Sequence, residues 1–180
     1  MVYIITALKS EAQAFIDRYK LQKESLGGYK IFRDKNMILI VSGIGVDRAR
    51  LATQTLINYF DITDEDIYLN IGICGADKRY EIGELIEIGQ IEYQQQNYRF
   101  KKSITRTIHC VDDEMTTDKY DIVDMESFGF YDAVTHSIAI KRKYILKVVS
   151  DHFEPSKITK DSTKAVLFNK IDDINKIIFQ

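Results

Sequence analysis

The sequence predicts a single-domain α/β fold, with three α/β/α layers built around a central mixed and twisted sheet. Strand-like and helix-like runs alternate through much of the chain. The apolar content is 45%, which suffices for one sizeable core, while 180 residues are few for two domains. No internal repeat or low-complexity linker divides the chain, and Pro155 is its only proline. We therefore treat residues 1–180 as one domain.

The first half of the chain predicts two βα units and a hairpin. Residues 2–7 are β-rich, and Ser10 with Gln13 three residues later matches a capping box that starts a helix. The apolar residues of this helix follow the spacing of one buried face: Ala12, Phe15, Ile16 and Tyr19. Residues 29–33 and 37–41 predict the hairpin. A glycine turn then leads into a helix with a buried stripe at Ala49, Ala52, Leu56 and Phe60.

The second half continues the alternation. We expect strands at residues 66–73, 83–91, 105–111 and 144–149, and helices at residues 125–136 and 160–179. The last helix carries apolar residues at helical spacing: Leu167, Ile171, Ile174 and Ile178. Residues 93–102 are rich in glutamine, aromatic and basic side chains, so that either an exposed strand or an irregular excursion fits them.

Composition and charge narrow the choice of partner. The net charge is −2 and the isoelectric point is near 5.9, so no basic field attracts nucleic acid or an anionic membrane, and we expect a small-molecule partner. There is no charged leader followed by a signal-like apolar stretch, and no apolar run approaches ~20 residues, so we expect a soluble, cytoplasmic protein. No cysteine or histidine has the spacing of a metal ligand, among Cys74, Cys110, His109, His136 and His152. We expect both cysteines to be reduced and structural and the histidines to be non-catalytic. We expect no metal or cofactor.

Three acidic residues stand at the ends of predicted elements. Glu11 lies where the first βα turn opens, Glu126 lies at the start of a helix, and Asp151 ends an apolar strand. Ligands of open α/β sheets bind at the carboxyl ends of strands, so these acids predict a pocket. Simpler explanations stay open. Glu11 and Glu126 fit first-turn acids favoured by the helix dipole, Asp124 fits an N-cap, and Asp151 fits a helix cap or loop acid.

Six segments of the chain occur in the order seen in the purine nucleoside phosphorylase and uridine phosphorylase superfamily. They are Ala7-Leu8-Lys9-Ser10-Glu11, Val41-Ser42-Gly43-Ile44-Gly45, Asn70-Ile71-Gly72-Ile73-Cys74-Gly75, Ile82-Gly83-Glu84-Leu85, Asp124-Met125-Glu126 and Val149-Ser150-Asp151. Within the superfamily the chain most resembles the methylthioadenosine/S-adenosylhomocysteine nucleosidases, and the resemblance spans nearly its whole length. It implies a nucleoside phosphorylase-like fold.

The resemblance also implies an activity, the hydrolysis of the N-glycosidic bond of an adenine-type nucleoside. Asp151 matches the aspartate that donates to the purine N7, a role that calls for a protonated carboxyl group, and Ser150 would orient it. Glu126 matches the glutamate that accepts hydrogen bonds from the ribose 2′ and 3′ hydroxyls, with Met125 packed against the sugar. Glu11 matches the residue that activates the attacking water. No metal takes part, and the family precedent implies a homodimer.

Further substrate contacts are implied at Met115, Ile73, Gly72 and Gly43, two of which depart from the family pattern. Ile73 stands where the nucleosidases usually carry a small polar residue, and Met115 stands where an aromatic side chain normally stacks on the purine. Sulfur packs on an aromatic ring less specifically than a second ring does. Ala76 also replaces a second glycine. The contacts to the sugar, to the base and on the nucleophile side are therefore expected to differ.

Two other functions stay open beside hydrolysis. The first is a phosphorylase that uses phosphate as nucleophile, although the early Gly-Asp-Pro-x-Arg segment of such relatives is missing, and a helix surface explains Arg48 and Arg50. The second is a non-catalytic nucleoside-binding domain. Between Gln90 and Thr105 the family has a longer segment that completes a neighbour's pocket for the 5′ substituent, so the resemblance leaves the 5′ group unspecified.

Overall fold

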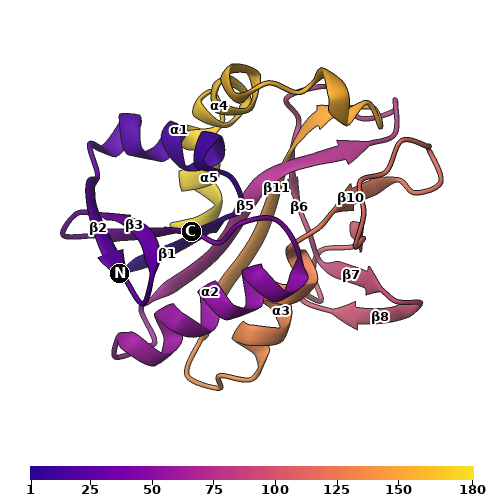
Figure 1. Ribbon diagram of the computed structural model, residues 1–180. Helices are drawn as coiled ribbons and strands as arrows, with labels where there is room; N and C mark the ends of the chain where they lie inside the picture. Colours follow the sequence, from indigo (N-terminus) through magenta and orange to yellow (C-terminus); the bar gives the residue numbers. More distant parts are fainter.

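A mixed sheet of eleven strands runs through the computed structural model, which describes residues 1–180 (Figure 1). Its centre is β5 (Ile67–Ala76), which lies parallel to both β1 (Val2–Thr6) and β11 (Arg142–Asp151). These strands are almost continuously buried, as expected for parallel strands with helices on both faces. Their carboxyl ends lie at the same edge of the sheet, where a ligand site of an α/β fold is expected.

The other strands extend the sheet on both sides of this centre. Beyond β1 the order is β4 (Met37–Val41), β3 (Tyr29–Arg33) and β2 (Gln22–Leu26), of which β4 is parallel to β1. Beyond β5 the order is β10 (Ile122–Asp124), β9 (Thr107–Cys110), β7 (Gln90–Tyr93) and β8 (Gln96–Arg99). The short β6 (Leu85–Glu87) pairs antiparallel with β11.

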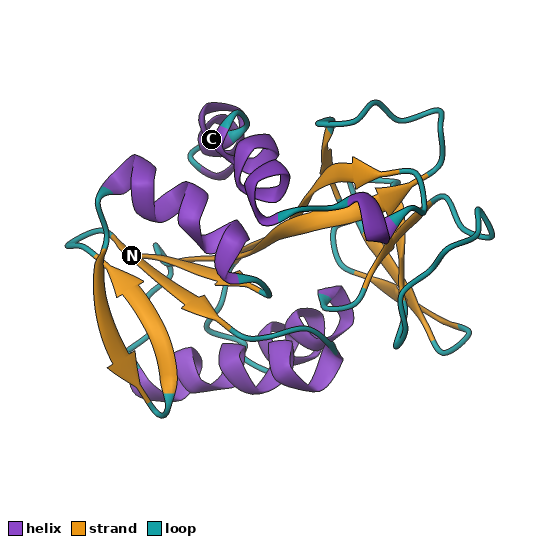
Figure 2. Ribbon diagram, turned by 45° about the horizontal axis from the view of Figure 1, so that its top comes forward, coloured by secondary structure: helices purple, strands orange, loops and turns teal.

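Helices cover both faces of the sheet (Figure 2). One face carries α1 (Lys9–Tyr19), α4 (Lys160–Phe168) and α5 (Ile171–Ile178), and the other carries α2 (Val46–Tyr59) and α3 (Ser127–Thr135). Two apolar cores result, one on each face of the sheet. The three-layer α/β/α prediction is confirmed. None of the helices combines the length and apolar character needed to cross a membrane.

The predicted start of the first helix is wrong. The helix begins at Lys9 after an extended Leu8, so Ser10 lies inside the first turn instead of capping it. The cap is provided by Glu11, whose carboxylate accepts a hydrogen bond from the Leu8 amide at 2.8 Å. Predicting the apolar face from its spacing was sound, because Ala12 and Phe15 are buried.

Local backbone geometry divides two of the predicted elements. The expected strand 83–91 is two strands, β6 and β7, separated by Gly89, where a Cβ atom would lie 1.9 Å from the carbonyl oxygen of Ile104. The expected helix 160–179 is likewise two helices, α4 and α5. Its four predicted apolar residues are nevertheless all buried, because the break leaves them facing the same core.

Residues 93–102, for which two structures stayed open, contain strand β8. It forms a hairpin with β7 through Gln94 and Gln95, both with positive φ, as a tight hairpin turn requires. Two strands were not predicted. Four of the five residues of β2 are exposed, so it lacks an apolar pattern, and β10 has only three residues.

Candidate active site

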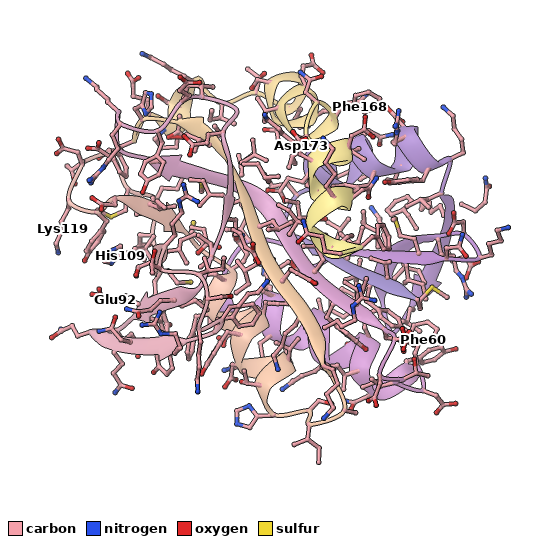
Figure 3. The ribbon with its side chains drawn as sticks, turned by 180° about the vertical axis from the view of Figure 1, so that it is seen from behind. Phe60, Glu92, His109, Lys119, Phe168 and Asp173 are labelled. Carbon is pink, nitrogen blue, oxygen red and sulfur yellow. The ribbon has the colours of Figure 1, made fainter.

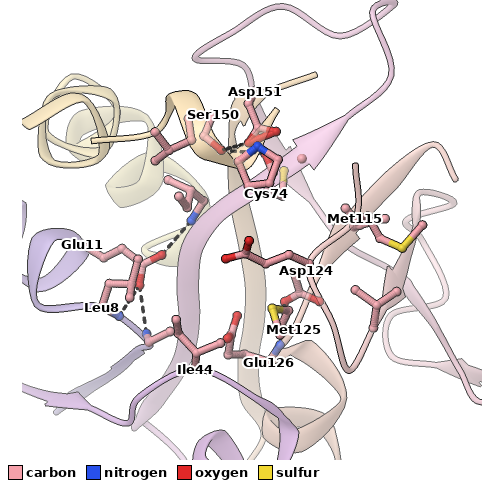
Figure 4. A pocket seen from close by; sticks show the side chains of 18 residues that line it. Leu8, Glu11, Ile44, Cys74, Met115, Asp124, Met125, Glu126, Ser150 and Asp151 are labelled. Atoms are coloured by element: carbon pink, nitrogen blue, oxygen red, sulfur yellow. Dashed lines mark hydrogen bonds between the residues drawn. The ribbon is translucent and has the colours of Figure 1, made fainter. Parts of the chain in front are cut away.

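A cavity of about 270 Å³ opens at the carboxyl ends of the central strands. Figure 4 shows Glu11 and Met115 on opposite sides of it, with Ser150 and Asp151 at one end and Glu126 toward the other. Ten of its eighteen lining residues are hydrophobic. Five others carry carboxyl groups: Glu11, Glu114, Asp124, Glu126 and Asp151. No lysine, arginine or histidine side chain lines the cavity.

The Glu11 carboxylate is held by backbone amides. Its Oε2 accepts hydrogen bonds from Ala7 at 2.9 Å and from Leu8 at 2.8 Å, and its Oε1 accepts one from Ile73 at 3.0 Å. Only 3% of the residue is exposed. Burial raises the pKa of Glu11, and the three amides and the nearby Lys147 oppose this shift only in part. Glu11 is therefore a rigid carboxyl group and a stronger base than an exposed glutamate.

Glu126 lies just before α3 and turns its carboxylate toward the loop that precedes α2. Its Oε1 accepts a hydrogen bond from the Gly45 amide at 3.0 Å, and the protein offers no such partner to its second oxygen. Burial and the neighbouring Asp124 raise the pKa of Glu126 to about 7, against the lowering effect of Lys147. The free oxygen is available to a ligand.

Beneath these acids lies an ion pair that is almost completely buried. The Nζ of Lys147 is 2.8 Å from Oδ2 of Asp124, and each side chain is 1% exposed. Burial alone would lower the pKa of Lys147, but the carboxylates of Asp124, Glu126 and Glu11 outweigh burial and raise it. The lysine thus stays charged and provides the positive charge closest to the acids.

Asp151 reaches the cavity because the strand that carries it is irregular. The register of β11 with β5 shifts between Val149 and Asp151, which leaves Ser150 as a bulge. A bulge redirects side chains, so that two consecutive residues both face the cavity. The Ser150 hydroxyl lies 3.1 Å from Asp151 Oδ2 and from the Cys74 carbonyl oxygen, and its single proton can go to either acceptor. Oδ1 of Asp151 accepts a hydrogen bond from the Glu154 amide.

Seven of the nine predicted site residues line the cavity: Asp151, Glu11, Ser150, Glu126, Met125, Met115 and Ile73. Gly72 and Gly43 do not. Gly72 instead lies behind Glu11, where an added Cβ would come within 2.7 Å of Oε1. Gly43 has a φ of +88° and packs against Arg48. Gly72, inside β5, therefore leaves room for the Glu11 carboxylate, and Gly43 shapes the loop before α2.

Three residues at or beneath the cavity were absent from the predicted site. Lys147 has a signal in the sequence, because a lysine inside the apolar run Ile145–Val149 of a buried strand needs a buried partner. Asp124 was predicted only as an N-cap. The N-cap of α3 is Glu126 instead, although Asp124 accepts a hydrogen bond from the Ser127 amide at 2.9 Å and pairs with Lys147. Glu114 lines the cavity from the loop between β9 and β10, and nothing in the sequence marks it.

None of the histidines lines the cavity. His109 lies beside Glu92 on the neighbouring strand (Figure 3). Its Nδ1 is 3.3 Å from the Glu92 carboxylate, and its ring stacks on Tyr120. His152 contacts the Ala76 carbonyl oxygen at 2.9 Å, and His136 is exposed. No group of His, Cys, Asp or Glu residues has a geometry that could hold a metal ion.

Comparison with known proteins gives a clear result only for the fold. No protein-family model and no curated protein sequence matches the chain. Among solved structures it is similar to the methylthioadenosine/S-adenosylhomocysteine nucleosidase of Helicobacter pylori with butyl-thio-DADMe-Immucillin-A, at a TM-score of 0.82 and 14% identity, over 99% of this chain and 97% of that one. It is also similar to the methylthioadenosine nucleosidase of Arabidopsis thaliana, at a TM-score of 0.78 and 15% identity, over 98% of this chain and 95% of that one.

The futalosine hydrolase of Helicobacter pylori is also similar, at a TM-score of 0.75 and 16% identity, over 96% of this chain and 97% of that one. The chain therefore has the fold of the nucleosidases, as its sequence segments predicted. Two Helicobacter pylori proteins with this fold are named as different enzymes, so the fold alone does not determine the reaction. The side chains of the cavity do.

Proposed function

We propose that this protein is an enzyme that hydrolyses the N-glycosidic bond of a purine nucleoside of the adenine type, such as methylthioadenosine or S-adenosylhomocysteine. One observation carries the proposal. Glu11 from α1, Glu126 from the start of α3 and Asp151 from the end of β11 bring three carboxyl groups to one largely apolar cavity. The fold shared with nucleosidases supports it.

The reaction needs all three carboxyl groups. Breaking the bond between base and ribose leaves positive charge on the sugar and negative charge on the base. Asp151, oriented by Ser150, supplies a proton to N7 of the base, and the free oxygen of Glu126 accepts the ribose hydroxyls. Glu11 takes a proton from the attacking water, a task for which its rigid and buried carboxylate is suited. Before the next turnover Asp151 takes up a proton from solvent, and Glu11 releases to solvent the proton that it took from the water.

Water is the nucleophile in this proposal. Phosphate would enter a cavity lined by five carboxyl groups and by no cationic side chain. The nearest buried cation, Lys147, is already paired with Asp124. Anion sites of proteins use arginine, lysine or clustered backbone amides. Here the amides of Ala7, Leu8 and Ile73 are already bound to Glu11, and that of Gly45 to Glu126. The cavity thus favours hydrolysis over phosphorolysis.

We further propose a cytoplasmic homodimer. Two free, buried cysteines suit a reducing compartment. Ile44, in the loop just before α2, is 45% exposed and also lines the cavity, and Leu51 on α2 is 54% exposed. A second copy that covers this apolar surface would close the cavity mouth. Light scattering that gives twice the chain mass of 20.9 kDa would support the dimer, and a single chain mass would contradict it.

The activity test follows free base by chromatography. Purified protein is incubated with methylthioadenosine, S-adenosylhomocysteine, adenosine, inosine or guanosine, each with and without phosphate. We expect phosphate-independent release of adenine. Asp151→Asn and Glu126→Gln should each lower kcat/KM by about 10²- to 10⁴-fold, because each removes one charge-specific contact of the transition state. The exposed Asp113→Asn on the neighbouring loop is the matched control and should change little.

Three outcomes would contradict the proposal. Near-normal rates in both Asp151→Asn and Glu126→Gln would show that these carboxyl groups do no chemistry. Base release that requires phosphate would favour a phosphorylase. Thermal stabilisation by a nucleoside that is never consumed would indicate a binding domain without catalysis.

A further inference from the structure

The buried Lys147–Asp124 pair has no part in the chemistry just proposed, yet it lies directly behind it. Two charged side chains that are each 1% exposed are costly to bury, so a fold retains them only with good geometry and further hydrogen bonds. Lys147 lies opposite Gly72 in the pairing of β11 with β5, and Gly72 in turn lies behind Glu11. The lysine is therefore fixed by the centre of the sheet and faces the acids of the cavity.

Asp124 connects this lysine to the backbone around Glu126. Its Oδ2 accepts hydrogen bonds from Lys147 Nζ at 2.8 Å and from the Ser127 amide at 2.9 Å, and its Oδ1 accepts one from the Ser127 hydroxyl at 2.7 Å. Since Ser127 follows Glu126 directly, these contacts fix the first turn of α3. The Glu126 carboxylate itself is held by only one hydrogen bond, from Gly45.

We propose that Lys147 and Asp124 act together as positioning residues, with Asp124 fixing the backbone that carries Glu126 and Lys147 providing the buried positive charge that favours the ionised form of the Glu126 carboxylate. The inference rests on the proposed function for its kinetic consequence. Neither residue touches the reacting atoms in this proposal. Without Lys147, the uncompensated negative charge of Asp124 would favour the protonated form of Glu126. A protonated carboxyl group binds the ribose hydroxyls less well than a carboxylate does.

Other ionisable groups also face Glu126. Among them, Lys147 is the cation whose positive charge offsets the negative charges around Glu126. Asp124 comes from β10 and Glu11 from α1, and both disfavour the charged form of Glu126. Cys110 on β9 stays a neutral thiol because burial raises its pKa. The Gly45 amide and Lys147 act in the opposite direction. Substituting Lys147 should therefore change the pH at which Glu126 ionises, which a purely structural ion pair would not do.

The test combines a titration with kinetics. Carbon-13 NMR of labelled glutamate carboxyl groups in the free protein gives the midpoint at which Glu126 titrates, with Glu126→Gln identifying the signal. We expect Lys147→Met to raise this midpoint by about one pH unit or more and Asp124→Asn to lower it. The midpoint should stay near that of the wild type in two other variants. Lys147→Arg keeps the positive charge, and the double variant Asp124→Asn with Lys147→Met removes both charges.

The pH profile of kcat/KM should shift in the same way, with kcat/KM of Lys147→Met at least about fivefold below that of Lys147→Arg at pH 7. If Lys147→Met does not fold, Asp124→Asn still carries the test, with the double variant as its charge-neutral control. An unchanged midpoint in Lys147→Met, or in Asp124→Asn where Lys147→Met does not fold, would overturn the inference. The titration needs no turnover, so a wild-type protein that hydrolyses nothing would contradict the proposed function and leave the positioning pair standing.

Discussion

At the scale of single residues, the environment gives each acid of the cavity a different capacity. Glu11 is enclosed by three backbone amides and cannot turn, whereas Glu126 has one fixed and one free oxygen. Asp151 is partly exposed and lies beside a serine hydroxyl that can rotate. In the proposed hydrolysis the rigid carboxyl group would act on the attacking water, the free oxygen of Glu126 would accept the ribose hydroxyls, and the accessible Asp151 would contact the base.

Glu11→Gln tests the role of the rigid base. We expect kcat to fall by roughly 10²- to 10⁴-fold while nucleoside affinity changes by only a few fold, because an amide cannot take a proton from water. The neutral amide also turns an N–H group toward one of the backbone donors that now bind Glu11, so stability should drop modestly. Steady-state kinetics and a binding isotherm measure the two effects separately. A loss of affinity with unchanged kcat would assign Glu11 to binding.

The sequence predicted this residue-scale arrangement only in part. Glu11, Glu126 and Asp151 stand at element ends, which is a local signal, and the fold brings them to one cavity. The partner of Lys147 could not be predicted, because it depends on β10, a three-residue strand that no periodicity reveals. Asp124 resembled an ordinary cap because its short-range hydrogen bond is the part of its role that sequence spacing shows.

At the scale of elements, α3 is fixed on two sides, and this determines where Glu126 lies. On one side Gly129 lets α3 approach α2 so closely that an added Cβ would lie 2.0 Å from the Val46 carbonyl oxygen. On the other side Phe128 stacks on Tyr93 at 4.4 Å between ring centroids and contacts Tyr98 of the β7–β8 hairpin. Val46 directly follows Gly45, whose amide binds Glu126, so helix packing and the site are coupled.

Gly129→Ala should therefore disturb stability and site together. We expect a loss of about 2–3 kcal/mol and a decrease in Tm of roughly 5–10 °C, because a methyl group would meet the backbone of α2. Catalysis should fall in the folded fraction, since α2 and Gly45 would move away from Glu126. Thermal melting monitored by circular dichroism gives the first quantity. Thr135→Ala, at the exposed end of the same helix, is the control and should stay within about 0.5 kcal/mol of the wild type.

The alternation of strands and helices was predictable because buried faces impose a period on the sequence. Interruptions within the elements were not. Gly89 divides β6 from β7 because of a contact with Ile104, fifteen residues away. The closing helix divides into α4 and α5 although its apolar spacing continues through Leu167 and Ile171. Such breaks depend on tertiary packing, for which a local window of sequence carries little signal.

At the scale of the whole molecule, the buried acids make stability depend on pH. The pKa of Glu126 rises from an ordinary 4.5 to about 7 in the folded protein, and burial also raises the pKa of Glu11. Protons therefore bind the folded state more tightly than the unfolded one. For Glu126 this contribution is fully present below about pH 4.5 and is lost as the pH rises through 7. At 1.36 kcal/mol per pKa unit it amounts to about 3 kcal/mol.

We accordingly expect the free energy of unfolding to decrease by a few kcal/mol between pH 5 and pH 8. Acids with lowered pKa values, such as Asp66 beside the chain N-terminus, contribute in the opposite direction but titrate below this window. Urea denaturation at pH 5, 6, 7 and 8 measures the slope. Glu126→Gln, which cannot titrate, should show a clearly smaller decrease, and the remainder reports on Glu11 together with His109, whose pKa is lowered by burial and which contributes in the opposite direction. Equal slopes in the two proteins would mean that Glu126 keeps an ordinary pKa, and the cavity at neutral pH would then be more negative than its burial implies.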